Sequence, residues 1–247
     1  MNKKYKKNFL KGVLAKIDFS VPIPDFDTGL KADFVKKIIK LFPLKESNKL
    51  IGQELQFAVH GVQTRNVEKI EWFFYGKDRE KKLSINENSM FVEFTKYETY
   101  TKLKEDFTVA VDALYDSYPE LAVNRFGLRY VNNIDLREEN PLEWLRFLDA
   151  KLLNNLQMPF NMEFLSRFFT SLDFNFSNMN LRFQYGNHNP DYPAPIKRKL
   201  FVLDFDAYLQ IYHEKKDIFC NLDIFHSKIE EYFESCITQE FRDYLDE

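Results

Sequence analysis

The sequence predicts an α+β fold in which two similar halves form one curved antiparallel sheet with helices on one face. Apolar residues recur mainly at the two-residue period of strands, and a few segments have the helical period. The order of these segments in the first half returns in the second. Because the predicted strands outnumber the helices that could connect them singly, an antiparallel sheet with one covered face buries the apolar side chains most simply.

The composition excludes several classes of protein. The chain has 247 residues, of which 45% are apolar, and its 35 Lys and Arg nearly balance its 38 Asp and Glu. Such a chain is not intrinsically disordered. Aromatic residues reach 17%, whereas Gly occurs only 7 times, which favours strands over Gly-rich phosphate loops. We expect residues 1–247 to form a single domain made of two pseudo-repeats, at about 9–119 and 123–247.

The first half is predicted to contain a strand, a helix, four strands and a second helix. Apolar and polar residues alternate from Val13 to Phe19, and Pro22 ends this strand because proline cannot continue the hydrogen-bonded ladder. Residues 99–117 carry an apolar stripe at helical spacing, which Pro119 stops. The elements expected here are a strand at 12–20, a helix at 32–42, strands near 55–60, 70–75, 82–86 and 90–97, and a helix at 99–117.

The second half repeats this order. The segment Lys16–Phe19 resembles Asn133–Leu136, and Val92–Tyr97 resembles Leu203–Tyr208, so an internal duplication is predicted. The irregular stretch Tyr185–Lys199 is either an ordinary long connection or a loop that binds a partner. The elements expected here are a strand at 123–136, a helix near 142–154, strands near 165–176, 180–185 and 199–209, a helix near 222–236 and a short final helix capped by Thr238.

The most specific motif is the run Asn124–Asn133, with sequence NRFGLRYVNN. On a strand, Arg125, Arg129 and Asn133 share one face, and Gly127 lies between the two arginines. Two interpretations remain open. The arginines form cross-strand ion pairs with Glu93, Asp204 or Asp206 on the same sheet face, or they hold a carboxylate or phosphate of a ligand in bidentate geometry.

A second pattern is the pair Asp204 and Asp206, whose carboxylates project from one face of a strand. Paired acids serve as metal ligands or as an acid/base couple, so a metal-dependent nuclease or phosphodiesterase is the alternative function. No third acid, Lys or His stands at a recognisable spacing. The motifs of zinc sites, P-loops, dinucleotide-binding sites and serine hydrolases are absent from the sequence, and no cofactor is expected.

Partners and compartment are constrained only broadly. The N-terminus and Lys197–Lys199 are basic clusters, but a net charge of −3 does not favour a nucleic-acid binder. No segment has the apolar length of a membrane helix or the core of a signal peptide. The two cysteines, Cys220 and Cys236, are too few for a disulfide framework, so a cytoplasmic protein is expected.

The segment Arg125–Asn132, together with Phe91–Phe94 before a long helix and the late Leu203–Asp206, resembles the hallmark of a sporadically distributed bacterial protein family of unknown function. Phe126 stands where a smaller aliphatic residue is expected in this RxGLRY motif. The resemblance carries no catalytic residues, and its patchy distribution implies mobile genes in a phage-defence or toxin–antitoxin setting. At the level of topology alone, the two halves also resemble the saddle of the TATA-binding protein.

These observations together predict a non-enzymatic binding or regulatory module. Its uncovered sheet face is expected to meet a protein partner or a small anionic ligand, and no oligomeric state is predicted. The residues expected to form this binding face are Glu93, Arg125, Arg129, Asn133, Asp204 and Asp206.

Overall fold

The computed structural model describes the backbone of residues 4–58 and 61–247 and the side chains of residues 4–49 and 69–247. Its strands form one nine-stranded antiparallel sheet in the order β2-β3-β4-β5-β1-β6-β9-β8-β7. The strands are β1 (Leu10–Phe19), β2 (Leu44–Ala58), β3 (Gly61–Tyr75), β4 (Lys81–Ile85), β5 (Ser89–Phe94), β6 (Val123–Leu136), β7 (Phe168–Phe176), β8 (Met179–Asn187) and β9 (Lys199–Leu209). The predicted α+β class and antiparallel sheet are confirmed.

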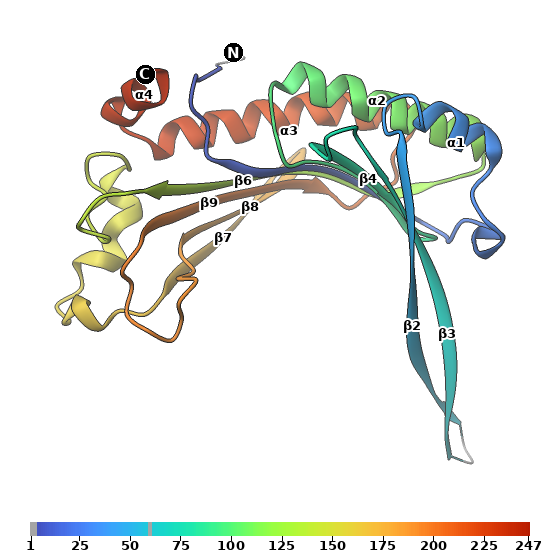
Figure 1. The fold of residues 1–247 in the computed structure, drawn as a ribbon, viewed down its shortest axis with the longest axis horizontal. Helices are drawn as coiled ribbons and strands as arrows, with labels where there is room; N and C mark the ends of the chain where they lie inside the picture. The colour runs from blue at the N-terminus through green and yellow to red at the C-terminus, as the bar shows by residue number, and fades with distance from the viewer. Residues whose placement is uncertain (1–3, 59–60) are drawn as a thin grey trace.

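The α-helices lie together on one side of this sheet, above it in Figure 1. They are α1 (Ala32–Ile38), α2 (Tyr100–Ser117), α3 (Lys215–Cys236) and α4 (Gln239–Asp246), and the 3-10 helices are η1 (Phe26–Thr28), η2 (Ala150–Gln157) and η3 (Met162–Phe164). Within the described residues, the opposite side of the central strands carries no α-helix (Figure 1), and we call it the open face.

The two ends of the sheet extend past the open face. At one end, β2 and β3 pair with each other along their whole length, whereas β3 pairs with β4 only over Trp72–Tyr75. The rest of this hairpin therefore projects as a two-stranded ribbon (Figure 1). At the other end lie η2 and η3, in yellow in Figure 1. The open face is therefore flanked by the β2–β3 ribbon at one end and by η2 and η3 at the other.

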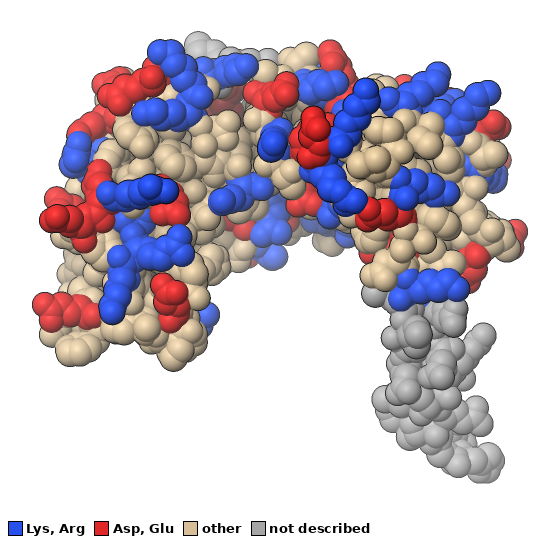
Figure 2. All heavy atoms as spheres, in the orientation of Figure 1, with Lys and Arg blue, Asp and Glu red and all other residues tan. Residues whose placement is uncertain are grey.

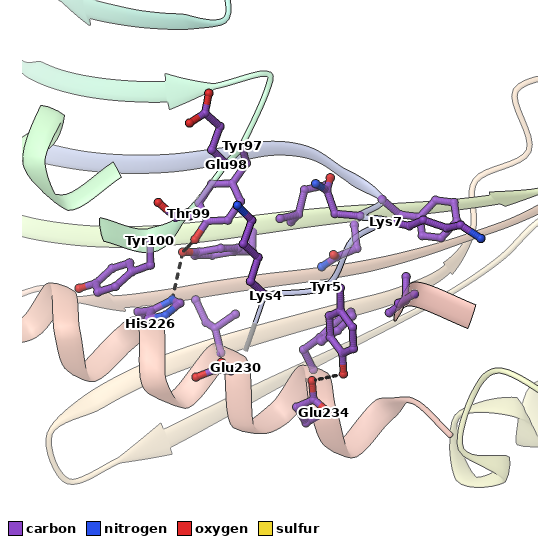
Figure 3. A pocket seen from close by; sticks show the side chains of 18 of the residues that line it. Lys4, Tyr5, Lys7, Tyr97, Glu98, Thr99, Tyr100, His226, Glu230 and Glu234 are labelled. Carbon is purple, nitrogen blue, oxygen red and sulfur yellow. Dashed lines mark hydrogen bonds between the residues drawn. The ribbon is translucent and has the colours of Figure 1, made fainter. Parts of the chain in front are cut away.

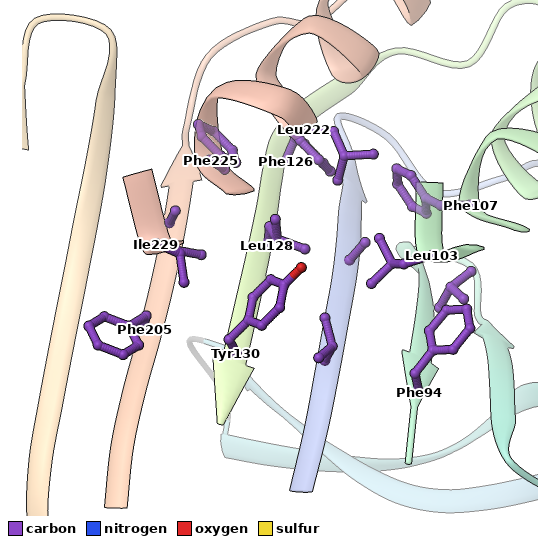
Figure 4. Close-up of a cluster of buried hydrophobic side chains, with 14 of the residues drawn as sticks. Phe94, Leu103, Phe107, Phe126, Leu128, Tyr130, Phe205, Leu222, Phe225 and Ile229 are labelled. Atoms are coloured by element: carbon purple, nitrogen blue, oxygen red, sulfur yellow. The ribbon is translucent and has the colours of Figure 1, made fainter. Parts of the chain in front are cut away.

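The core is the layer between the sheet and the helices α2 and α3. In β1, every second residue from Val13 to Phe19 is buried on the helix side. Phe126 of β6 lies between Phe107 of α2 and Phe225 of α3, with ring centroids 5.8 Å and 5.3 Å away (Figure 4). These stacked rings join both long helices to the middle of the sheet.

The predicted helix near 142–154 is wrong. The chain forms turns up to Asp149 and then the 3-10 helix η2. Tertiary hydrogen bonds explain the difference, because Asp149 N donates to Cys236 O and Thr238 N donates to Phe147 O. These bonds join the segment to the link between α3 and α4, and they use backbone groups that a continuous helix would need.

Several other boundaries differ from the prediction, and the largest differences are the following. Helix α1 ends at Ile38, earlier than expected. Helix α3 begins at Lys215, seven residues before Leu222, because Glu214 and Asp217 form a reciprocal capping box. The strands near 55–60 and 70–75 are the ends of the longer β2 and β3, and the part of the first prediction that falls on residues 59–60 lies outside the described residues. Thr238 caps α4, as predicted.

Candidate functional site

The structure places the six predicted site residues on the open face of neighbouring strands. Phe126, Leu128 and Tyr130 of β6 are buried on the helix side, so the alternate residues of this strand point the other way. The pairing register then sets the facing residues of β9 and β1 on the same side. The site residues on this face are Glu93 on β5, Arg125, Arg129 and Asn133 on β6, and Asp204 and Asp206 on β9.

Arg129 and Asp204 form a bidentate ion pair across β6 and β9. Nε of Arg129 donates to Oδ1 of Asp204 at 2.8 Å, and Nη2 donates to Oδ2 at 2.6 Å. The Asp204 side chain is 8% exposed, whereas that of Arg129 is 45% exposed. Both carboxylate oxygens of Asp204 are therefore engaged, while part of the guanidinium still faces solvent.

Arg125 lies between two carboxylates and contacts each at a longer distance than Arg129 contacts Asp204. Its Nη1 is 3.5 Å from Oδ2 of Asp18 on β1, and its Nη2 is 3.7 Å from Oδ2 of Asp206 on β9. Its guanidinium also lies over the ring of Tyr208, 5.0 Å from the centroid. Gly127 makes this position possible, since a Cβ there would lie only 3.4 Å from Nη1 of Arg125 and 3.3 Å from Cβ of Tyr208.

Asp206 is the least satisfied acid of this group. Burial raises the pKa of its carboxyl group, and Arg125 and Arg129 act in the opposite direction. Asp206 lies directly opposite Arg129 in the strand pairing, yet Arg129 bonds to Asp204 instead. The closest cation contact of Asp206 is the 3.7 Å approach of Arg125. A donor from a partner would therefore improve the surroundings of this carboxylate.

Glu93 and Asn133 lie away from this centre. Glu93 pairs with Lys82 of β4 at 2.9 Å, on the far side of β1 from the arginines. Asn133 lies further along β6, and its side-chain Oδ1 is buried without a hydrogen-bond partner. Of the three acids expected to pair with the arginines, Asp204 and Asp206 do so and Glu93 does not.

Two further cations of the open face are also paired with carboxylates. Lys16 contacts Asp18 at 2.7 Å, and Arg182 of β8 contacts Asp173 of β7 at 2.9 Å. Figure 2, which views the molecule from the side, shows blue and red side chains interspersed over much of the surface that it presents. Positive and negative side chains therefore alternate on the open face and form ion pairs with each other.

Sequence reasoning missed a second feature, a cavity of about 330 Å³ on the helix side of the sheet. Its walls are the N-terminal segment before β1, the link between β5 and α2, the middle of β6, and the helices α3 and α4 (Figure 3). The only signal in the sequence was Tyr130, the tyrosine of the RxGLRY motif, which the strand period places on the face opposite Arg125 and Arg129.

A chain of polar rings lies in this cavity. The hydroxyls of Tyr97 and Tyr130 are 3.2 Å apart, and the Tyr130 hydroxyl is 3.1 Å from Nδ1 of His226. The His226 ring stacks on Tyr100, with centroids 3.7 Å apart. Burial raises the pKa of Tyr97 to about 12 and lowers the pKa of His226. All of these rings are therefore neutral at pH 7.

Comparison with known proteins leaves the site to be argued from its chemistry. No protein-family model matches the chain, and the curated proteins include no significant match. Within the described residues, no three His, Cys, Asp or Glu side chains are grouped so that they could hold a metal ion. No helix in that part of the chain has the length and apolar character needed to cross a membrane.

Proposed function

We propose that the protein is a non-enzymatic binding module and that its open face binds a protein partner. The observation that carries the proposal is the pairing of charges on this face. Five cations of this face contact a carboxylate of a neighbouring strand or of their own strand. These pairs are Lys16–Asp18, Lys82–Glu93, Arg125–Asp18, Arg129–Asp204 and Arg182–Asp173.

This pattern favours a protein over a small anionic ligand or a nucleic acid. An anion bound at Arg129 would reach only the donors that the bidentate Asp204 leaves over and would lie beside that carboxylate, and one bound at Arg125 would meet the carboxylates of Asp18 and Asp206. A protein surface instead offers donors and acceptors together, so that it extends the alternation of charges without breaking the pairs. The half-exposed guanidinium of Arg129 is a suitable anchor, since arginine is enriched at interface hot spots.

The proposal includes the finer topology expected from the sequence, two pseudo-repeats arranged like the saddle of the TATA-binding protein. The strand order supports it: β3-β4-β5-β1 in the first half is mirrored by β7-β8-β9-β6 in the second, and β1 and β6 meet at the centre. In this arrangement β2 is an addition to the first half. A curved face between two ends is suited to a convex partner, and the resemblance in topology implies nothing about DNA.

The enzymatic alternative is a metal-dependent nuclease or phosphodiesterase that uses Asp204 and Asp206. This activity requires carboxylate oxygens that are open to a metal ion, but both oxygens of Asp204 accept hydrogen bonds from Arg129. We therefore expect that millimolar Mg²⁺, Mn²⁺ or Zn²⁺ leaves the melting temperature unchanged, because a ligand that binds only the folded state would raise it. A rise that disappears in the Asp204→Asn variant would favour the enzyme.

The proposed setting is a bacterial cytoplasm. The RxGLRY resemblance points to mobile bacterial genes, hence to phage defence or a toxin–antitoxin pair. Both cysteines are free thiols, and Cys220 is exposed, which agrees with a reducing cytoplasm.

The proposal is tested with the double variant Arg125→Ala/Arg129→Ala. The wild-type protein serves as bait in an extract of its native host, the captured partner is purified, and its affinity is measured by titration calorimetry. We expect the double variant to bind at least tenfold more weakly, because losing a hot-spot arginine costs about 2 kcal/mol or more. The matched control is Lys104→Ala/Arg146→Ala, which removes two cations that pair with Asp223 and Glu240 of the helices.

Two results would contradict this function. One is equal affinity of the wild type and the open-face variant. The other is loss of the cooperative thermal transition in the open-face variant alone, which would make the two arginines structural residues.

A further inference from the structure

The cavity on the helix side is independent of the open face, although β6 contributes to both. Tyr130 points into the cavity, whereas its neighbour Arg129 points to the open face. The cavity lies between the sheet and α3, and the N-terminal segment that carries Tyr5 crosses it (Figure 3). The hydroxyl of Tyr5 donates to Glu234 of α3 at 2.6 Å, which closes this side of the cavity.

The walls divide into an apolar part and a polar part. Ile134, Ile229 and Phe233 provide apolar surface, together with Phe9 and Leu10 from the start of β1. The polar part is the hydrogen-bonded chain of Tyr97, Tyr130 and His226, with the amide of Asn132 beside it on β6. Ligand pockets typically combine mostly apolar walls with a few placed polar groups, at volumes of about 300–1,000 Å³.

The polar chain is suited to a neutral group. A tyrosine hydroxyl donates and accepts, and a neutral imidazole donates from one nitrogen and accepts at the other. The chain Tyr97–Tyr130–His226 can therefore reverse its direction of donation to suit either a donor or an acceptor. Against this chain a full charge would exchange its hydration for neutral hydroxyl and imidazole groups, which is costly, although the carboxylates of Glu230 and Glu234 also line the cavity.

We propose that this cavity binds a small neutral amphipathic molecule, whose single hydroxyl or carbonyl group bonds to the Tyr97–Tyr130 hydroxyls and whose apolar body lies against Ile229 and Phe233. The charged groups on the lining, which include Lys4, Lys7 and Glu98, are of both signs and do not select an ion. The proposal does not rest on the function of the open face.

The test compares four probes with the same phenylpropyl body. 4-Propylphenol carries a neutral hydroxyl, propylbenzene carries no polar group, and 3-phenylpropanoate and 3-phenylpropylamine carry opposite charges. Dissociation constants are measured with the full chain by ligand-observed NMR titration. We expect 4-propylphenol to bind most tightly, roughly three- to tenfold more tightly than propylbenzene, which is the range of one net hydrogen bond.

Three variants locate the probe. Tyr130→Phe removes the central hydroxyl and should weaken 4-propylphenol roughly three- to tenfold while leaving propylbenzene unchanged. Ile229→Trp fills the cavity and should abolish binding of both. The matched control is Tyr232→Phe, which removes a hydroxyl from the same helix at a residue that packs against Phe174 and Phe176, outside the cavity.

The outcomes decide the question. Absence of binding by all four probes overturns the proposal, and so does binding of 4-propylphenol that Tyr130→Phe does not weaken. Tightest binding of either ion overturns the choice of a neutral ligand. If Ile229→Trp does not fold, Tyr130→Phe and Tyr232→Phe still separate a specific site from adventitious binding. The Arg125→Ala/Arg129→Ala variant should bind 4-propylphenol like the wild type, so failure here is distinguishable from failure of the protein-binding function.

Discussion

Replacing Asp106 with Ala is expected to lower the free energy of unfolding by about 3–5 kcal/mol. Asp106 of α2 is 1% exposed, and its Oδ2 lies 2.6 Å from Nζ of Lys81 of β4, which is 8% exposed. The substitution leaves the ammonium group of Lys81 under the helices without its counter-charge, close to the Phe42 ring. Removing one partner of a buried ion pair is costly because the remaining charge keeps its desolvation penalty.

Urea denaturation of three further variants makes the result specific. The second cation at Asp106 is Lys102, whose side chain is 42% exposed. Lys102→Ala should therefore lower the free energy of unfolding by less than about 1 kcal/mol. The double variant Lys81→Met/Asp106→Leu replaces both charges with apolar side chains and should recover most of the lost stability. If Asp106→Ala lowers the free energy of unfolding only slightly, or if the double variant is no more stable than Asp106→Ala, Lys81 and Asp106 do not form a buried pair whose disruption is costly.

The second large effect is expected at Phe126, the residue where the RxGLRY resemblance predicts a smaller side chain. Phe126→Ala should lower the free energy of unfolding by about 3–5 kcal/mol. The ring is fully buried between Phe107 and Phe225 (Figure 4). It also meets the ring of His213 edge-on. Its loss leaves a cavity where α2, α3 and the sheet converge.

Phe126→Leu should cost less than Phe126→Ala, because it leaves a smaller void. The matched surface control is Asn124→Ala, two residues earlier on β6, where the side chain is exposed and the change should stay within about 0.5 kcal/mol. Thermal and urea unfolding measure all three. Equal stability of Phe126→Ala and Asn124→Ala would mean that the stacked rings do not hold the helices on the sheet.

These two predictions concern the scaffold that presents the open face. Phe126 and Tyr130 hold one side of β6 against the helices, so the alternate residues Arg125 and Arg129 emerge on the other side. A defect in the scaffold should therefore weaken partner binding together with stability. The open-face double variant should weaken binding alone, and this contrast separates the two roles.

Local sequence patterns predicted the central elements well. The alternation placed Arg125 and Arg129 together on one face of β6, and Asp204 and Asp206 together on one face of β9, because side chains in a strand alternate with an exact period of two. The helical stripe and Pro119 bounded α2, and Thr238 was correctly predicted as the cap of α4. These features depend on residues that are close together in the chain, so local sequence patterns are sufficient to predict them.

The predictions failed where distant segments compete for the same backbone groups. The segment near 142–154 has helical spacing, yet Asp149 N bonds to Cys236 O instead of closing a helical turn. Local propensity is a weak prior, and such tertiary bonds override it.

By itself, the sequence determined which side chains share a face, which segments are strands, and that the charges of the central strands are balanced. Only the tertiary structure decided that Arg129 pairs with Asp204, that Glu93 pairs with Lys82, and that Tyr130 meets His226 beside a cavity. The physical reason is that strand order and helix placement bring together residues far apart in the chain. The periodicity of the sequence does not show which residues that are far apart in the chain come into contact.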